Sequence, residues 1–417
     1  LPVVSAALRG WVGRGAAAVA GGVRGGTRRG LRRIGWMRDA SAGEVAVRVR
    51  PLLPPEFAGD AASESLPALY RHLFRPDPVE DPRFLVGRQP ELAAILDARA
   101  RWEAGHSAGI VVTGERGSGK TSLINCALLG PLEGLPIVRG EFRERVLDEQ
   151  SLRATIARIV GAEDPGSLED HLGGGRRVVV LEEIERTFLR HIGRYEAVRA
   201  LGRLINATSG TVLWIAVVNE VAFRFLERAI GLGHRFSHRI RAGTATSTQI
   251  REAVLVRHNL SGLRLRFEPP SPTGGLDGWL RRRRNGRTDA ERAFFDMVAR
   301  QSAGVYRTAF NIWLGHIASI GDGLCTIRAP ATSDLAPLIA ELSLEDLFSL
   351  VALLQHGSLT PAEHAVVFQQ PVEVSRAQID ELVAREIVAP DPGRPGYRVR
   401  PEAMSVAQEA LFRRNLL

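Results

Sequence analysis

A glycine-rich segment in the first half of the chain has the residue types and spacing of a phosphate-binding loop. It reads Gly114-Glu-Arg-Gly-Ser-Gly-Lys120-Thr121 and matches the pattern G-x-x-x-x-G-K-[ST]. Glycines let the backbone wrap phosphates with its N–H groups directed inward. Lys120 is placed to bridge the β- and γ-phosphates, and Thr121 to hold Mg²⁺. The pattern predicts an ATP site whose loop residues are Gly114, Glu115, Arg116, Gly117, Ser118, Gly119, Lys120, Thr121 and Ser122.

Lys120 is the only lysine in a sequence that holds 55 lysines and arginines together. An arginine bias of this kind is typical of a GC-rich genome. Lysine offers a compact ammonium group and arginine a planar fork, so the two do not substitute freely in a narrow pocket. The one retained lysine therefore favours a phosphate site over an ordinary glycine-rich turn.

Two later strands are predicted to end in polar residues that complete such a site. Residues 178–181 are apolar and are followed by Glu182 and Glu183. In P-loop enzymes a strand next to the phosphate loop delivers an acid to the Mg²⁺ shell, which predicts Glu182 and Thr121 as metal ligands. The following acid, Glu183, can orient the attacking water as general base. The usual first acid is Asp, so Glu182 puts efficient hydrolysis in question, but not binding; the alternative is two solvent-facing acids at a helix start.

The second such strand, residues 212–218, ends at Asn219. A polar side chain there is expected beside the γ-phosphate, where it can bind the attacking water. Asparagine is also a preferred N-cap for the helix that follows. The two roles are compatible, so both stay open.

These motifs need a framework that brings strand ends together. Short apolar strands are predicted at residues 110–113, 137–138, 178–181 and 212–218, with a last one near Ile240, and helical stretches lie between them. Alternation of this kind predicts an α/β fold, a parallel five-stranded sheet sandwiched between helices. Past about Thr244 only helices are expected, until a different pattern begins near Ser343.

The last block predicts three helices followed by two strands around the turn Asp391-Pro-Gly-Arg-Pro-Gly396, the layout of a winged helix-turn-helix. A winged helix usually reads DNA with its third helix, here residues 375–386. That helix carries more acids than arginines, which is unfavourable because phosphate contacts dominate DNA affinity. Docking to protein is therefore the alternative to DNA binding through the winged helix.

The charge of the chain is concentrated near its start. Residues 1–50 hold ten arginines against Asp39 and Glu44, so most of the formal net charge of +9 lies there. Such an arm can contact anionic membrane or nucleic acid, or it can be a solvated linker. The predicted divisions are a basic tail at 1–43, a Pro-rich linker at 44–82, a nucleotide-binding domain at 83–243, a helical lid at 244–335 and a winged-helix domain at 336–417.

In this order the motifs resemble an AAA+ ATPase of the origin-recognition-initiator and STAND-like group, over about residues 84–417. Phe84-Leu-Val-Gly-Arg88 is similar to the family box that lies against adenine, which implies Val86, Gly87 and Arg88 as binding residues. The acidic strand end then corresponds to the family's Walker B motif, and Asn219 to its first sensor.

The resemblance also implies arginines that act on the γ-phosphate. Ser302-Ala-Gly-Val-Tyr-Arg307 is similar to the lid's second sensor, so Arg307 would reach this phosphate. The region before Ile240 often carries the arginine finger, which makes Arg235 and Arg239 candidates. The predicted catalytic residues are thus Glu182, Glu183, Asn219, Arg235, Arg239 and Arg307.

Together these features favour an ATP/ADP-dependent molecular switch, a slow Mg²⁺-dependent ATPase that couples nucleotide state to a protein partner or to self-oligomerisation. The first alternative is a DNA-binding initiator or transposition-type ATPase. The second is a membrane-associated regulatory ATPase tethered by the basic arm. Cys126 and Cys325 have no metal-binding spacing and fit a reducing, cytoplasmic setting. Because the chain begins with Leu1 rather than Met, the presence of an upstream domain, even a membrane domain, stays an open alternative.

Overall fold

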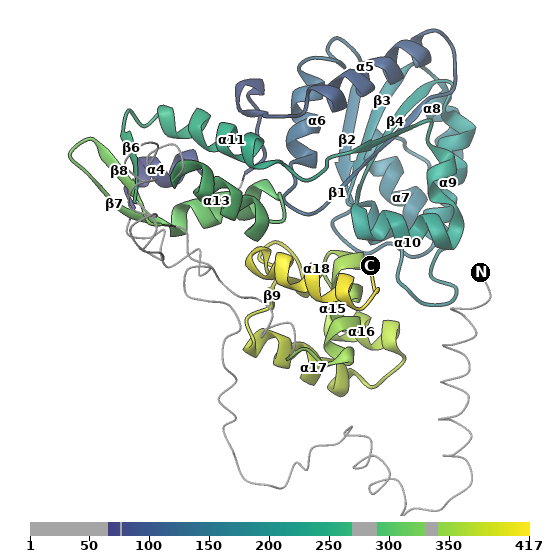
Figure 1. Cartoon of the computed structure of the whole chain (residues 1–417). Coiled ribbons are helices and arrows are strands. Elements are labelled where there is room, and N and C mark those ends of the chain that lie inside the picture. The colour runs from purple at the N-terminus through teal and green to yellow at the C-terminus, as the bar shows by residue number, and fades with distance from the viewer. Residues whose placement is uncertain (1–65, 76, 269–289, 330–340) are drawn as a thin grey trace, which may run out of the picture. The chain divides into compact units, whose positions relative to one another are not determined.

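The computed structural model describes residues 66–75, 77–268, 290–329 and 341–417, all within one compact unit, Arg50–Leu417 (Figure 1). The predicted basic tail, most of the Pro-rich linker and an arginine run at 281–284 lie outside the described residues.

The centre of the chain is a five-stranded sheet whose strands all run parallel. Its order is β2-β3-β4-β1-β5. The strands are β1 (Gly109–Gly114), β2 (Ile137–Glu141), β3 (Arg177–Glu182), β4 (Val212–Asn219) and β5 (His238–Arg241). The predicted α/β class with a five-stranded parallel sheet is confirmed. Because parallel strands end at the same edge, the phosphate loop after β1, the acids after β3 and Asn219 meet there.

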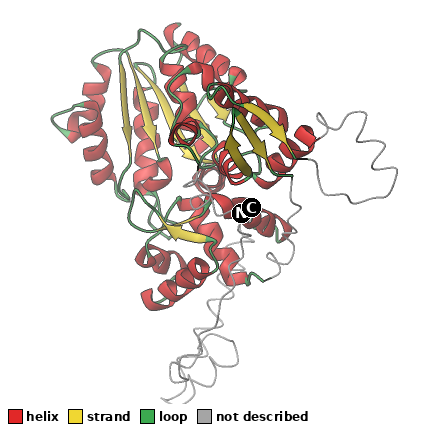
Figure 2. Cartoon of the chain, turned by 90° about the vertical axis from the view of Figure 1, so that its left-hand side faces the viewer, coloured by secondary structure: helices red, strands yellow, loops and turns green. Residues whose placement is uncertain are grey.

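Alternate residues of the strands belong to different cores, as expected for side chains that point to opposite faces. On β4, Trp214 and Ala216 face one core, and Leu213 and Ile215 face the other. The first core includes α7 (Glu149–Val160), α8 (Leu168–Gly173), α9 (Glu196–Thr208) and α10 (Glu220–Ile230). The second includes α5 (Gln89–Glu103) and α6 (Lys120–Leu128). Helices thus cover both faces of the sheet (Figure 2).

A second, three-stranded sheet corrects the expectation that strands stop near Thr244. It has the order β6-β8-β7, with β6 (Arg264–Phe267) parallel and β7 (Ile317–Gly321) antiparallel to β8 (Leu324–Ile327). These strands are four or five residues long. Such lengths are too short for periodicity to distinguish them from loops. The sheet lies with the lid helices α11 (Ser247–Asn259), 290–301 and α13 (Tyr306–Gly315).

The C-terminal region has the predicted order of three helices and two antiparallel strands, followed by a helix that the sequence analysis did not predict. These elements are called the C-terminal domain below. They are α15 (Leu344–His356), α16 (Pro361–Phe368), α17 (Val372–Ala384), β9 (Val388–Pro390), β10 (Tyr397–Val399) and α18 (Met404–Arg413). The β9–β10 hairpin carries the turn at Asp391.

A short helix at the start of the described chain anchors the linker. Within α4 (Ala68–Leu73), Tyr70 is buried in the core of the lid. Its hydroxyl accepts a hydrogen bond from the Trp313 indole at 3.2 Å and lies 2.9 Å from Nδ1 of His258. This anchor leads the following residues across the phosphate loop. Five 3₁₀ turns complete the described elements, at η2 (Pro82–Phe84), η3 (Pro165–Ser167), η4 (Ile184–Thr187), η5 (Leu232–Arg235) and η6 (Pro401–Ala403).

The buried His364 of α16 predicts an acid-sensitive C-terminal domain. Burial, reinforced by Arg190, lowers its pKa from 6.5 to about 4. Between these values the unfolded chain binds a proton that the folded chain does not, so stability falls as the pH drops below about 6.5 and levels off below about 4. Lowering the pH from 7 to 5 therefore reduces the free energy of unfolding by about 2 kcal/mol through His364.

The check is urea unfolding of the wild type and of His364→Gln at both pH values. The amide can still bond the hydroxyls of Ser349 and Ser375, which lie 3.1 and 3.0 Å from the imidazole nitrogens. We expect the wild type to lose about 2 kcal/mol more than the variant between pH 7 and pH 5. Equal losses would show that His364 does not couple folding to protons.

Candidate functional site

The phosphate loop has a backbone that only glycine adopts easily. Gly117 and Gly119 have φ of 85° and 92°, and Gly119 is the residue before the first turn of α6. A Cβ at Gly117 would lie 2.9 Å from the Cβ of Arg307. The loop therefore turns tightly beneath the lid and directs the N-terminus of α6 toward its own interior, which is a favourable place for phosphate.

A cavity of about 260 Å³ opens at this loop. Its lining brings together most of the residues predicted for the site: Val86, Arg88, Arg116, Gly117, Ser118, Gly119, Lys120, Thr121, Ser122, Glu182, Glu183, Asn219 and Arg307. Gly87, Gly114 and Glu115 belong to the same segments but do not line it. The lining combines charged residues with aromatic side chains, among them Phe84, Tyr306 and Phe310, which suits a molecule with a phosphate part and an apolar ring.

Lys120 is held inside the loop. Its Nζ donates to the carbonyl oxygens of Gly114 at 2.8 Å and Glu115 at 2.9 Å. Burial lowers its pKa, while the carboxylates of Glu185 and Glu183 oppose that shift. The ammonium is thus already positioned by the loop backbone, and a phosphate would replace carbonyl partners with a charged one.

Glu182 and Thr121 lie together, as predicted for a metal pair. The Thr121 hydroxyl donates to Oε2 of Glu182 at 2.8 Å. The other oxygen, Oε1, accepts two bonds from Arg139 of β2, from Nε at 2.7 Å and Nη2 at 2.5 Å. Hydroxyl and carboxylate oxygens are hard ligands that fit Mg²⁺, which usually keeps several waters and takes few protein ligands. These two groups could therefore hold the ion beside phosphate.

The strand that delivers Glu182 is not next to the phosphate-loop strand, contrary to the sequence-based expectation. β4 lies between β1 and β3. The Glu182 side chain nevertheless meets Thr121, with 2.8 Å between Oε2 and the hydroxyl. The position of β4 also explains why Asn219, at its end, lines the cavity between the two motifs.

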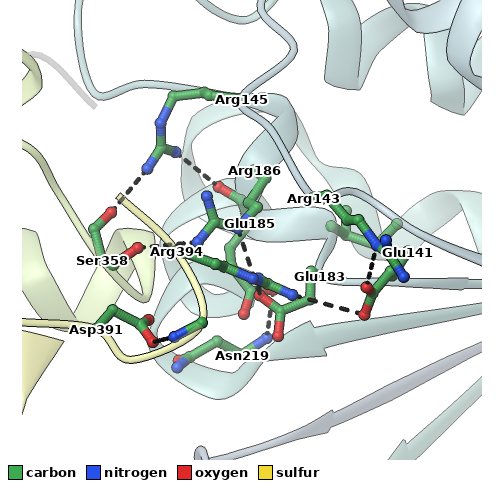
Figure 3. Close-up of polar contacts among 12 residues, drawn as sticks. Glu141, Arg143, Arg145, Glu183, Glu185, Arg186, Asn219, Ser358, Asp391 and Arg394 are labelled. Atoms are coloured by element: carbon green, nitrogen blue, oxygen red, sulfur yellow. Dashed lines mark hydrogen bonds and ion pairs between the residues drawn. The ribbon is translucent and has the colours of Figure 1, made fainter. Parts of the chain in front are cut away.

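Glu183 is in a strained conformation and is engaged by the C-terminal domain. Its φ of 63° is left-handed, which is uncommon for a residue with a side chain. Its Oε2 accepts a hydrogen bond from Nη1 of Arg394, in the β9–β10 hairpin (Figure 3). Arg186 lies 3.6 Å from the same oxygen. The predicted general base is therefore paired with arginine rather than left to orient water.

A third acid, Glu185, lines the cavity and was missed by the sequence analysis. It is buried and accepts a hydrogen bond from the backbone N–H of Asn219 at 3.1 Å. Burial, and then the charge of Glu183, raise its pKa, and Lys120 opposes this. The run Glu-Glu-Ile-Glu contains the signal, but only the 3₁₀ turn η4 places the third carboxyl back against β4. Asn219 accepts from the N–H of Val221 at 2.8 Å, so it caps α10 and lines the cavity.

The box at residues 84–88 lines the cavity and also bonds to the phosphate loop and to the lid. Arg88 is buried and its Nη2 donates to the carbonyls of Ser118 at 2.9 Å and Gly243 at 2.8 Å. The carbonyl of Val86 accepts from the Tyr306 hydroxyl at 2.9 Å. Gly87 has a φ of 68° and lies against the side chain of Gln249. This box ties the phosphate loop to the lid.

A buried arginine that lines the cavity beside aromatic rings was also missed. The guanidinium carbon of Arg257 lies 4.6 Å from the ring centre of Phe310 and 5.4 Å from that of Phe84. Burial lowers its pKa to about 10, so it keeps its charge at neutral pH. Nothing in the local sequence distinguishes Arg257 from other arginines of a helix, because its aromatic partners come from distant segments.

The other predicted arginines divide into two groups. Arg307 lines the cavity, and burial, followed by the charge of Arg116, lowers its pKa. Arg235 and Arg239 do not line the cavity of their own chain. Arg239 donates to Glu227 at 3.1 Å, and Arg235 packs near Gly202. If either is an arginine finger, it serves another copy of the chain.

The C-terminal domain is joined to the site through several polar contacts. Arg116 of the phosphate loop donates to Asp391 of the hairpin at 2.9 Å, and Gln408 of α18 donates to Glu115 at 2.5 Å. Burial raises the pKa of Asp391, but the hydrogen bond and charge of Arg116 outweigh burial and leave the pKa lowered. The hairpin thus contacts both the loop and the acid pair.

The chain was compared with known proteins. No protein-family model and no curated protein matches it. Among solved structures, it is similar to ORC2 of Aeropyrum pernix in ADPNP and ADP complexes, with 14% identity, 83% of this chain and 98% of that chain covered and a TM-score of 0.38.

Two further structures are similar over the same part of the chain. ORC1 of Aeropyrum pernix in complex with DNA has 18% identity, covers 83% and 98% and has a TM-score of 0.40. Cdc6p of Pyrobaculum aerophilum has 14% identity, covers 82% and 98% and has a TM-score of 0.42. In the described part of the chain, no helix has the length and apolar character needed to cross a bilayer.

Arg145 connects the domain of the parallel sheet to the C-terminal domain. We expect its substitution to cause a large loss of stability. Its side chain is 7% exposed and bonds Glu363 at 2.5 Å and the carbonyls of Ser358 and Phe188 at 2.8 and 3.0 Å. Arg145→Met removes the ion pair of the half-buried Glu363 carboxylate and the hydrogen bonds to two carbonyls, so we expect a loss of about 3–5 kcal/mol in urea unfolding.

The matched control is Arg143→Met, two residues away. Arg143 is 82% exposed and pairs with Glu141 (Figure 3). Exposed pairs contribute about 0–1 kcal/mol, so the control should stay close to the wild type. Similar losses in both variants would refute the bridging role of Arg145.

Proposed function

We propose that the chain is an ATP-binding molecular switch and a slow ATPase, in which nucleotide at the phosphate loop controls the docking of the C-terminal domain. The observation that carries this proposal is the contact of one hairpin with both halves of the site. Arg394 pairs with Glu183, and Asp391 pairs with Arg116 of the phosphate loop.

Phosphates and the hairpin would compete for the same charges. Arg116 lines the cavity while its guanidinium is bonded to Asp391. Both contacts are charge-assisted, but a triphosphate carries several negative charges where Asp391 carries one, so it is the stronger competitor for the guanidinium of Arg116. Loss of the Arg116–Asp391 bond would weaken docking. Nucleotide binding would thereby be converted into release of a domain that can meet a protein partner or another copy of the chain.

The same contact supports slow turnover. A general base must reach the water whose proton it takes. Glu183 is bonded to Arg394, so it is engaged while the hairpin is docked. Mg²⁺, held by Thr121 and Glu182, would neutralise charge that develops on the phosphates. Lys120, Arg116 and Arg307 would bind and orient the phosphates, and Asn219 would position water. Glu183→Gln should slow turnover and leave ATP binding intact.

The first prediction concerns the lysine. Lys120→Ala removes a charge-assisted bond to phosphate worth about 1.5–3 kcal/mol, so it should raise the Kd for ATP by about 10- to 100-fold. It should also abolish the nucleotide-dependent change in oligomeric state. Calorimetry and analytical ultracentrifugation, each with and without ATP, measure the two effects. An unchanged affinity would refute the nucleotide site; an unchanged response of oligomeric state would refute the switch.

The second prediction concerns docking. Arg394→Gln removes the charge that holds the hairpin on Glu183, so hydrogen exchange in β9 and β10 should increase about tenfold or more and turnover should rise. Arg413→Gln is the control, because Arg413 is an exposed arginine of α18 that pairs along its own helix with Glu409. If the two variants behave alike, hairpin docking does not regulate the site.

Binding of duplex DNA distinguishes the proposed switch from a DNA-acting ATPase. Two arginines at the hairpin are engaged internally: Arg394 of the turn pairs with Glu183, and Arg400, directly after β10, pairs with Glu402 at 3.6 Å. Salt-dependent binding of duplex DNA by the wild type, lost in a charge-reversed hairpin, would favour the DNA-binding function instead.

A further inference from the structure

The carboxylate of Glu182 is shared between two partners, and one of them is a cation that belongs to the chain. Thr121 occupies Oε2, and Arg139 binds Oε1 through both Nε and Nη2. The Glu182 side chain is 12% exposed and Arg139 is 31% exposed. The acid expected to meet a metal is therefore already neutralised by a guanidinium.

Arg139 is fixed in place by further bonds. Its Nη1 donates to Oδ1 of Asn125 at 2.7 Å, and the amide of Asn125 donates to the carbonyl of Val79 at 3.0 Å. The N–H of Val79 in turn donates to the Ser122 hydroxyl at 2.9 Å. A chain of bonds thus runs from the linker over α6 to β2. A fixed guanidinium loses little freedom in holding Glu182, which makes this an ordered part of the site.

We propose that Arg139 is a positioning residue that takes over the charge-compensating part of the metal's role at Glu182, so that nucleotide binds almost equally well with and without a divalent cation. A bare carboxylate beside the β- and γ-phosphates repels them, and a bound cation normally cancels this repulsion. Arg139 cancels it permanently. Lys120, Arg116 and Arg307 also line the cavity and meet the phosphate charge. Among the described residues, no group of three or more His, Cys, Asp or Glu could hold a metal alone.

This inference rests on the proposed nucleotide site, but its test is separate. Calorimetry would measure the Kd of full-length protein for ADP and for a non-hydrolysable ATP analogue, in excess Mg²⁺ and in excess EDTA. For the wild type the two Kd values should agree within about threefold. For Arg139→Met the Kd in EDTA should exceed that in Mg²⁺ by about tenfold or more, because removal of Arg139 leaves Glu182 facing the phosphates.

Two further variants separate charge compensation from a general loss of structure. Arg153→Met removes a similarly exposed arginine of α7 that pairs with Glu169 of α8 and does not line the cavity, and its ratio of Kd values should match the wild type. The double variant Arg139→Met/Glu182→Gln removes both charges and should restore metal-independent binding, which a merely structural defect could not do.

The outcomes are distinguishable. A wild-type ratio of about tenfold or more overturns the inference and leaves the proposed function standing. A double variant as metal-dependent as Arg139→Met also overturns it. Absence of nucleotide binding in both conditions refutes the proposed function itself.

Discussion

The need to compensate carboxylates at one edge of a parallel sheet organises much of this molecule. Glu182 ends β3, Glu183 and Glu185 lie just beyond it, and all three line the same cavity. A buried carboxylate without a partner is costly, because desolvation is not repaid. Each is compensated differently: Glu182 by Arg139 of β2, Glu183 by Arg394 of the hairpin, and Glu185 by a raised pKa and a backbone N–H. The site is therefore assembled from distant parts of the chain.

This arrangement makes the C-terminal domain part of the electrostatics of the cavity. Removing the hairpin would leave Glu183 with Arg186 at 3.6 Å and would free Arg116 from Asp391. Both changes alter the charge that an anionic ligand meets. Arg145 is a second attachment of this domain, because its buried contacts with Glu363 and Ser358 lie outside the hairpin.

Local patterns were sufficient for the parts of the site that are contiguous in sequence. The phosphate loop was predicted from the spacing of its glycines, Lys120 and Thr121, and the acid pair and Asn219 from short apolar runs followed by polar residues. The parallel five-stranded sheet followed from the alternation of strands with helices. Glu182 was correctly placed beside Thr121. The predicted catalytic and sensor roles are still untested.

The sequence analysis missed what depends on distant contacts. Arg139 and Arg257 are ordinary arginines in their local sequence, and only folding places one against Glu182 and the other between two phenylalanines. The order of the sheet, with β4 between β1 and β3, leaves no periodic signal. The three strands after Thr244 were missed because in β6 arginines alternate with only Leu265 and Phe267, which is too short a pattern to be distinctive.

The insertion of β4 between the two motif strands has a mechanical consequence. Asn219 ends that strand inside the cavity and caps the first turn of α10, and α10 packs against α15 of the C-terminal domain. The strand end that lines the cavity and the helix that packs on α15 are therefore one continuous piece of backbone, joined at the Asn219 cap. The C-terminal domain thus meets the framework of the cavity through the packing of α10 as well as through the charged contacts of the hairpin.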